Sequence, residues 1–384
     1  RYEVGRAPGG LNAYPKMGVW DDGTYNSTGQ RGYTFTMRDF GVSGFIGSGV
    51  MERDAMLNGD PAQFIKFQQT CTVVDCREGT LPAHLDAGPV PANTCPTFFP
   101  HFDSQFDDGP SVVDGARNDV LCVDWDTIGN STYTEQAFIP GAAFDRALGN
   151  GFSDCINPVM GGEPLDCLAI FTMHPAQVRN HGTHCSALIN TTVDVGGDVG
   201  GIRWGELRSS DCQTGWAFHQ EGTYAPDASD RWMGSLAMDG DGNIALGYSV
   251  ASASLFPSVR YTSRMASDPL GTMPGGEESC HEGTGAQTGS ANRWGDYSRM
   301  GVDPGDDCTF WYTTEYYETT SSFNFKTRIC SFKFPDCGDG GGGIPCGDID
   351  RFQARCLAGG RVQYRVIMTD NSHDGETVTF QIDG

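Results

Sequence analysis

Four residues have the types and spacing to bind a sugar or a carboxylate. Arg231 begins one Arg-Trp pair, and Arg293 begins another that is followed by Asp296 and Tyr297. A guanidinium, a carboxylate and a phenol together offer the donors and acceptors that a polyhydroxylated ligand requires. In the alternative interpretation, which the sequence favours, each Trp packs between neighbouring sheets while its Arg stacks or pairs with an acidic neighbour.

Acidic turns form a second kind of candidate site. Asp239, Asp241 and Asn243 place oxygen ligands at alternate positions, an arrangement that suits Ca²⁺. The run is not an EF-hand, because Ile244 and Val250 stand where that loop requires Gly and Glu. A tight hairpin turn is the alternative interpretation. The full set of candidate calcium ligands is Asp239, Asp241, Asn243, Asp303, Asp306, Asp307, Asp194 and Asp198.

A histidine pair resembles one block of a protease triad. Residues 180–186 read Asn-His-Gly-Thr-His-Cys-Ser, in which a first His would accept the proton of a serine nucleophile. No matching nucleophile block follows and no matching Asp block precedes it, so the simpler interpretation is a turn and the start of a strand. A metal held by His174, His181 and His184 is the remaining alternative.

The elements that carry these residues repeat. Trp232 and Trp294 are 294 − 232 = 62 positions apart, and a turn rich in Asp and Gly follows each of them. In both copies an Asp precedes a Tyr by nine positions, at 239 and 248 and at 303 and 312. A strand-built repeat of this length is typical of propeller blades. The sequence therefore predicts an all-β β-propeller, with five blades counted and six or seven possible, whose channel mouth would hold the four ligand-binding candidates.

The chain divides by composition into three parts. Residues 1–337 form the predicted propeller, residues 338–345 a Gly-rich linker, and residues 346–384 a partial β module or β appendage. Strands expected at 361–369 and 376–382 could pair with a neighbouring copy, which would allow self-association by strand addition.

Cysteine usage indicates an oxidising compartment. The 14 cysteines are dispersed without the paired spacing of metal knuckles, so disulfides and a secreted or cell-surface location are expected. The chain opens on Arg1 and is interpreted as a trimmed piece of a longer secreted precursor. Proximity alone suggests the pairs Cys71 with Cys76, Cys155 with Cys167, Cys330 with Cys337, and Cys346 with Cys356.

The charge balance limits the choice of partners. With 49 acidic and 25 basic residues the formal charge is −24, which disfavours nucleic acid and favours divalent cations. Surface solvation is the alternative reason for this acidity. No run approaches the roughly twenty apolar residues of a membrane span.

Residues 222–235, 243–250 and 293–316 carry a family resemblance. These stretches, which include Arg-Trp-Gly-Asp-Tyr-Ser and Asp-Asp-Cys-Thr-Phe-Trp-Tyr-Thr, resemble the propeller-like region of large secreted or cell-surface bacterial modular proteins. The resemblance covers roughly residues 10–337 and implies an extracellular or surface location. It assigns no catalytic residues.

Two functions are compatible with these observations. The favoured one is a non-catalytic scaffold or adhesion protein of an extracellular filament or matrix, stabilised by disulfides and calcium, which binds a glycan or a protein surface. The alternative is an extracellular propeller hydrolase or lyase that acts on glycans at an axial site near Asp296. The first predicts no compact acid–base pair at the channel mouth, whereas the second requires two carboxylates within roughly 5 to 10 Å.

Overall fold

Strands account for almost all of the regular structure. A computed structural model describes residues 11–40, 45–70, 79–87, 89–100, 102–103, 114–145, 148, 154–157, 159–169, 171–289, 292–335, 337–338, 349–356, 362–368 and 377–382. The chain divides into two compact units, Arg1–Phe332 and Lys333–Gly384. The helical elements of the described residues are α1 (Arg53–Asn58) and η1 (Ile128–Asn130).

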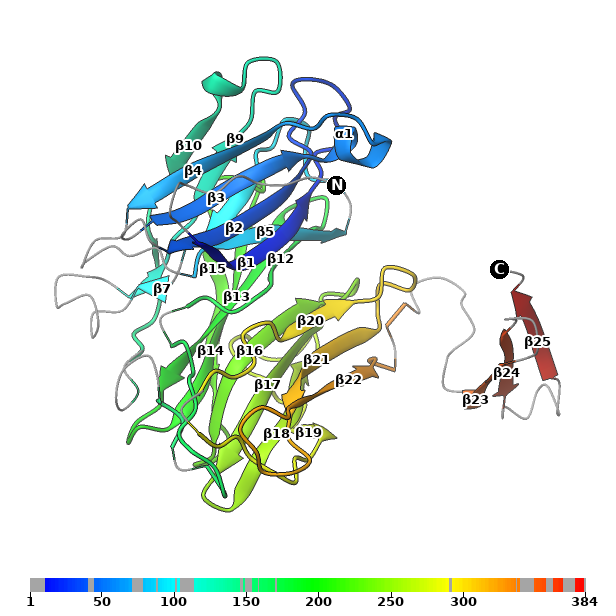
Figure 1. The fold of residues 1–384 in the computed structure, drawn as a ribbon. Coiled ribbons are helices and arrows are strands. Elements are labelled where there is room, and N and C mark those ends of the chain that lie inside the picture. Colours follow the sequence, from blue (N-terminus) through cyan, green and yellow to red (C-terminus); the bar gives the residue numbers. More distant parts are fainter. Residues whose placement is uncertain are drawn as a thin grey trace. The chain divides into compact units, whose positions relative to one another are not determined.

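Five successive antiparallel meanders make up the described part of the first unit (Figure 1). The first contains β1 (Leu11–Trp20), β2 (Gly32–Phe40), β3 (Phe45–Glu52) and β4 (Phe64–Thr70). The second contains β5 (Leu81–Ala87), β6 (Thr97–Phe99), β9 (Asp119–Cys122) and β10 (Thr132–Glu135). The third contains β12 (Ala176–Asn180), β13 (Cys185–Asp194), β14 (Gly200–Ser209) and β15 (Ala217–Tyr224). The fourth contains β16 (Asp230–Met238), β17 (Ile244–Ser252), β18 (Leu255–Arg264) and β19 (Glu278–His281), and the fifth contains β20 (Arg299–Val302), β21 (Phe310–Tyr316) and β22 (Lys326–Phe332). A small sheet of β7 (Phe102–Asp103), β8 (Gly115–Ala116) and β11 (Ile139–Pro140) is inserted in the second meander's region.

The first strands of the five meanders are neighbours. Strand β1 contacts β5, β5 pairs in parallel with β12, and β16 contacts both β12 and β20. The series closes where Lys16 of β1 donates a hydrogen bond to the Asp296 carbonyl just before β20. This order of blades around an inner set of strands is a five-bladed β-propeller, which confirms the predicted fold class. The β5–β12 pairing joins the second and third blades into one eight-stranded sheet.

The repeat seen in the sequence corresponds to the fourth and fifth blades. Trp232 and Trp294 are buried with ring centroids 5.9 Å apart, so each Trp packs between neighbouring blades as the architectural interpretation predicts. Tyr248 and Tyr312 are also fully buried. A Cβ on Gly247 would lie 2.6 Å from the Tyr312 ring, so only a glycine permits this close approach of the two sheets.

Disulfides join Cys95 to Cys122, Cys155 to Cys167, Cys185 to Cys212 and Cys280 to Cys330. Cys308 and Cys337 are disulfide-bonded as well. The Cys155–Cys167 prediction is confirmed. The predicted Cys330–Cys337 pair is wrong, because β22 lies beside β19 of the preceding blade and brings Cys330 within 5.9 Å of Cys280, Cα to Cα. Cys71, Cys76 and Cys346 lie outside the described residues.

The second unit contains one antiparallel sheet. It is formed by β23 (Ile349–Cys356), β24 (Val362–Met368) and β25 (Thr377–Ile382), with β24 in the centre. The strands that were expected to pair with another copy thus pair with each other. Of the expected Gly-rich linker, residues 339–345 lie outside the described part of the chain. In the portion of the chain with described structure, no helix combines the length and the apolar character needed to traverse a bilayer.

Candidate active site

A tight turn before β20 presents the first group of candidate residues. Trp294 anchors the turn, because its ring is buried and its Nε1 donates to the Ser249 hydroxyl at 2.9 Å. Gly295 has a φ of +60°, and the Ser298 amide donates to the Gly295 carbonyl at 2.9 Å. The turn therefore projects Arg293, Asp296 and Tyr297 away from the buried Trp.

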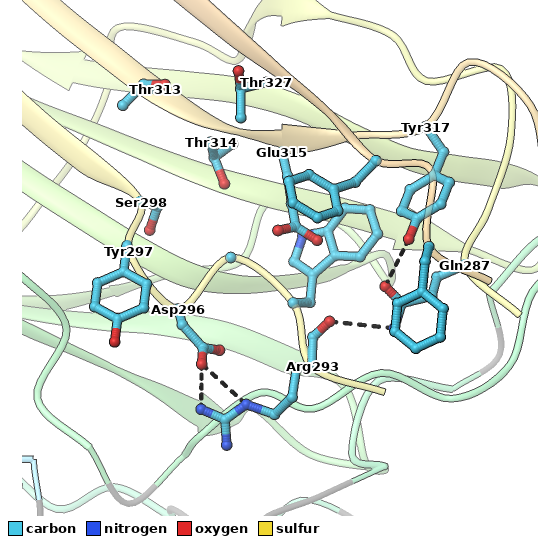
Figure 2. Close-up of a pocket in the computed structure, with 14 residues that line it drawn as sticks. Gln287, Arg293, Asp296, Tyr297, Ser298, Thr313, Thr314, Glu315, Tyr317 and Thr327 are labelled. Atoms are coloured by element: carbon cyan, nitrogen blue, oxygen red, sulfur yellow. Dashed lines mark hydrogen bonds and ion pairs between the residues drawn. The ribbon is translucent and has the colours of Figure 1, made fainter. Parts of the chain in front are cut away.

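A cavity of about 460 Å³ lies beside this turn (Figure 2). Glu315 of β21 enters it from the opposite side, because the strand alternates buried and open residues and Glu315 lies on the open face. Phe323 and Phe325 line the same cavity with exposed fractions of 76% and 52%. The cavity thus combines carboxyl groups with exposed aromatic rings.

One guanidinium joins two carboxylates at the turn. The Asp296 carboxylate accepts hydrogen bonds from Arg293 Nε, at 3.0 Å, and from the adjacent terminal nitrogen. The other terminal nitrogen of Arg293 lies 3.4 Å from Asp166 Oδ2, and Asp166 is buried. The two carboxylates therefore contact the same planar group from different sides.

Glu315 is held in its neutral form up to unusually high pH. Burial raises the pKa of its carboxyl, a backbone hydrogen bond from Gly295 lowers it, and the negative charge of Asp296 raises it, so that the pKa is about 7. Burial also raises the pKa of Asp166, against the lowering effects of the Leu168 amide and of Arg293. A protonated Glu315 beside an Arg-bound Asp296 has the asymmetry of a proton donor and a carboxylate base.

Lys16 connects the first blade to this turn. Its ammonium donates to the Asp296 carbonyl at 2.5 Å and lies 4.1 Å from the ring centroids of both Tyr14 and Tyr297. Burial lowers the pKa of Lys16 to about 7. A bulge in β1 between Ala13 and Lys16, with Tyr14 at a φ of 52°, directs the side chain toward the turn.

Polar side chains of the inner strands β5, β12 and β20 contact one another near the propeller axis. Arg299 of β20 lies 3.0 Å from His84 Nε2, and the same nitrogen lies 2.7 Å from Asp86 Oδ1. Gln177 of β12 donates to Asp86, and Arg179 donates to the Met238 carbonyl at 3.1 Å. These contacts tie the inner strands together.

Of the four ligand-binding candidates, the structure brings three together. Arg293, Asp296 and Tyr297 line the cavity, whereas Arg231 does not. The Arg231 side chain is fully buried and pairs with Asp227 at 3.0 Å and with Glu277 at 2.7 Å. Its position in the repeat is equivalent to that of Arg293, yet its surroundings are those of a structural ion pair.

The candidate calcium ligands lie in turns that already use their carboxylates. Asp239 accepts hydrogen bonds from the amides of Asp241 and Asn243, at 3.0 and 2.9 Å, and from the Asn243 side chain. The carboxylates of four other candidates are also engaged in hydrogen bonds or ion pairs, namely Asp194 with Gly196, Asp303 with Gly305 and Trp311, Asp306 with Cys308 and Thr309, and Asp307 with Arg179. Asp198 lies in a turn with a left-handed φ of 58°. Among the described residues, no three His, Cys, Asp or Glu side chains gather into a metal-binding group. Calcium binding stays a prediction.

The histidines are divided between two ends of one strand. His181 and His184 stack with ring centroids 4.9 Å apart in the turn that joins β12 to β13, as the turn-and-strand interpretation predicts. His174 precedes β12, at its opposite end, where its Nε2 lies 3.4 Å from the Met17 carbonyl. The three therefore do not form one site.

Sequence reasoning missed Glu315, Asp166 and Lys16. For Glu315 a signal was present, because Trp311, Thr313 and Glu315 alternate with Phe310, Tyr312 and Thr314 along a predicted strand. That alternation places an acid on the same face as an exposed Trp. For Asp166 and Lys16 the sequence carries no such signal, since they reach the turn from distant segments.

Comparisons with known proteins give weak likenesses. No protein-family model and no curated protein matches the chain. Among solved structures it is similar to a protein of unknown function from Dyadobacter fermentans, with 11% identity over 97% of this chain and 94% of that chain and a TM-score of 0.39. It is also similar to Penicillium chrysogenum alpha-L-arabinanase complexed with arabinobiose, with 11% identity over 98% of this chain and 94% of that chain and a TM-score of 0.39. It is similar as well to an alpha-L-arabinofuranosidase of Fusarium graminearum, with 9% identity over 86% of this chain and 95% of that chain and a TM-score of 0.38.

The expectation of a non-catalytic scaffold is wrong. It required that no compact acid–base pair lie at the channel mouth, whereas Asp166, Asp296 and Glu315 gather around the turn that precedes the inner strand β20. The adhesion and filament roles are withdrawn with the scaffold hypothesis.

Proposed function

We propose that this chain is an extracellular glycoside hydrolase with Glu315 as the proton donor and Asp296 as the partner carboxylate. The observation that carries the proposal is a carboxyl group with a pKa near 7 facing an Arg-bound carboxylate in one cavity of about 460 Å³. Glycosidases use two carboxyl groups kept in different protonation states by their surroundings. The cavity volume suits a small number of sugar rings.

In the proposed reaction, Glu315 donates its proton to the oxygen that leaves as the glycosidic bond breaks. Asp296 carries the complementary negative charge, either toward the positive charge that develops on the sugar or toward an attacking water. Arg293 fixes the Asp296 carboxylate through two hydrogen bonds. Asp166, on the far side of Arg293, adds a second negative charge that keeps the guanidinium in place.

The disulfides support the proposed extracellular location. The disulfides of the described residues, among them Cys95–Cys122, Cys155–Cys167, Cys185–Cys212 and Cys280–Cys330, fit an oxidising compartment, in which a secreted enzyme meets polymeric glycans.

A hydrolysis screen tests the function directly. Purified protein is expected to release reducing sugar from at least one polysaccharide in a panel that includes arabinan and xylan. Because Glu315 must be protonated to donate, kcat is expected to fall above an apparent pKa near 7, about tenfold per pH unit well above it. Absence of release across the panel between pH 4 and 8 would reject the proposal.

Lys16→Met tests whether the first blade positions the catalytic turn. Loss of the hydrogen bond to the Asp296 carbonyl should lower kcat roughly tenfold, because the turn loses one of its fixed contacts. Folding should not suffer at pH 6. The folded-state pKa of Lys16 is below its unfolded value, so charging it opposes folding at low pH, and Met removes that cost. Unchanged kcat, or a thermal midpoint that drops at pH 6, would contradict this role.

A further inference from the structure

Open surface continues from the carboxyl site along the last blade. The cavity that contains Glu315 shares Thr313 with a second cavity of about 280 Å³. The second cavity is lined by residues of β20, β21 and β22, among them Gly301, Trp311 and Ile329. The two cavities are therefore neighbours over the same sheet.

Strand register explains why the two cavities meet. Trp311, Thr313 and Glu315 are alternate residues of β21, so they project from one face of the sheet. At 3.3 Å per residue, the row from Glu315 to Trp311 extends about 13 Å. Residues paired directly across the strands share that face, and they are Thr327 beside Glu315, Arg299 and Ile329 beside Thr313, and Gly301 and Ser331 beside Trp311.

Trp311 is an oriented aromatic platform at the far end of this row. Its side chain is 45% exposed, although an indole of this size is usually buried. The Asp303 carboxylate accepts a hydrogen bond from Trp311 Nε1 at 3.1 Å, which fixes the ring. Ile329, 63% exposed, extends the apolar surface next to it. A fixed, exposed indole is suited to stacking against the apolar face of a sugar ring.

Gly301 keeps the space beside the platform open. It is paired with Trp311, and a Cβ built on it would have one neighbour within 4 Å, Arg299 Nε at 3.8 Å. A larger side chain at this position would occupy the groove and leave the backbone of β20 undisturbed.

The charge of the molecule limits which glycan fits. Arg299 and Asp303 line the second cavity and Glu315 lines the first, and the whole chain has a formal charge of −24. A polyanionic glycan would be repelled by this surface, whereas a neutral one would not.

We propose that the face of β20, β21 and β22 is a substrate-binding groove for an extended, neutral glycan, with Trp311 binding a sugar several units away from the bond at Glu315. This inference rests on the proposed function, because it assumes that the chain cleaves glycans at Glu315. It assigns to the groove a preference for long over short substrates.

The groove is tested with oligosaccharide ladders. Neutral α-1,5-linked arabino-oligosaccharides and β-1,4-linked xylo-oligosaccharides of two to eight units are titrated by calorimetry into the full chain carrying Glu315→Gln, with polygalacturonate as the anionic probe. Six-unit chains of at least one series should bind about tenfold more tightly than two-unit chains. Trp311→Ala, or Gly301→Leu, should remove most of that gain. The matched control is Leu270→Ala, an exposed apolar residue outside the groove, which should leave the gain unchanged.

The outcomes separate the groove from the reaction. If Trp311→Ala and Gly301→Leu bind six-unit chains as tightly as the parent, or if polygalacturonate binds more tightly than the neutral chains, the groove is overturned while hydrolysis that depends on Glu315 can still stand. If none of the neutral chains binds, the groove is overturned as well. If long neutral chains bind in a Trp311-dependent manner but Glu315→Gln does not reduce hydrolysis, the groove stands and the assigned proton donor fails.

Discussion

Glu315→Gln is expected to lower kcat by about 10²- to 10⁴-fold on whichever glycan the wild-type chain cleaves. The amide keeps the shape of the carboxyl group but cannot donate the proton that the leaving oxygen requires. In the proposed reaction Glu315 sets the alkaline limb of the pH profile near pH 7, so the residual activity of the variant should lose that limb. Initial rates measured between pH 4 and 9 give both results.

Glu318→Gln is the matched control for this variant. Glu318 is an exposed acid three residues further along the chain, outside the cavity, and it accepts a hydrogen bond from the Tyr316 hydroxyl. Its substitution should leave kcat and the pH profile unchanged. Wild-type kcat in Glu315→Gln would reject Glu315 as the proton donor.

The carboxyl group of Glu315 should also make the folding stability depend on pH. The folded-state pKa of Glu315, about 7, exceeds its ordinary value of 4.5, so the folded chain binds more protons than the unfolded chain in that interval. Stability should therefore decline as pH rises from about 4.5 to 7, by up to about 3 kcal/mol. Glu315→Gln should flatten this decline and melt above the wild type at pH 8.

Arg231→Met is expected to cost about 3 kcal/mol of folding free energy with little direct effect on binding. Arg231 is fully buried, and its removal leaves Glu277, itself 15% exposed, without one of its two arginine partners. Arg293→Met is the matched variant from the next repeat. Its side chain is 51% exposed, so it should lose little stability and at least tenfold in kcat/KM, because Asp296 loses two hydrogen bonds.

Denaturant unfolding and hydrolysis assays on both variants decide between these roles. The two arginines hold equivalent positions in the 62-residue repeat, so the repeat alone predicts equal effects. Equal losses of stability, or a greater loss of activity in Arg231→Met at a temperature where both are folded, would contradict the division of roles.

The fold could be predicted from the sequence because its signal is local. Each hairpin in the repeat brings its own strands, turn and Trp, and Trp232 and Trp294 occupy the interblade positions that the spacing indicates. Blades before the repeat are less regular, since the second blade is interrupted by β7 and β8.

Only the part of the site that lies within the single turn before β20 could be predicted from the sequence. Arg293, Asp296 and Tyr297 are neighbours in sequence and remain neighbours in the structure. Lys16 and Asp166 reach the turn through contacts between segments remote in sequence, which no local pattern records. The Cys280–Cys330 disulfide was missed for the same reason.

The contact between Lys16 and Asp296 joins the first inner strand to the last, and this determines the stage of folding at which the contact can form. Contacts between segments so far apart in the chain form late, because the entropy of closing a long loop must be overcome before they stabilise anything. The blades can form one after another during synthesis, but the turn that holds Asp296 gains its final support only when the ring closes. Under the proposed function, enzymatic competence would thus arise in the last folding step, so partly folded chains would be inactive.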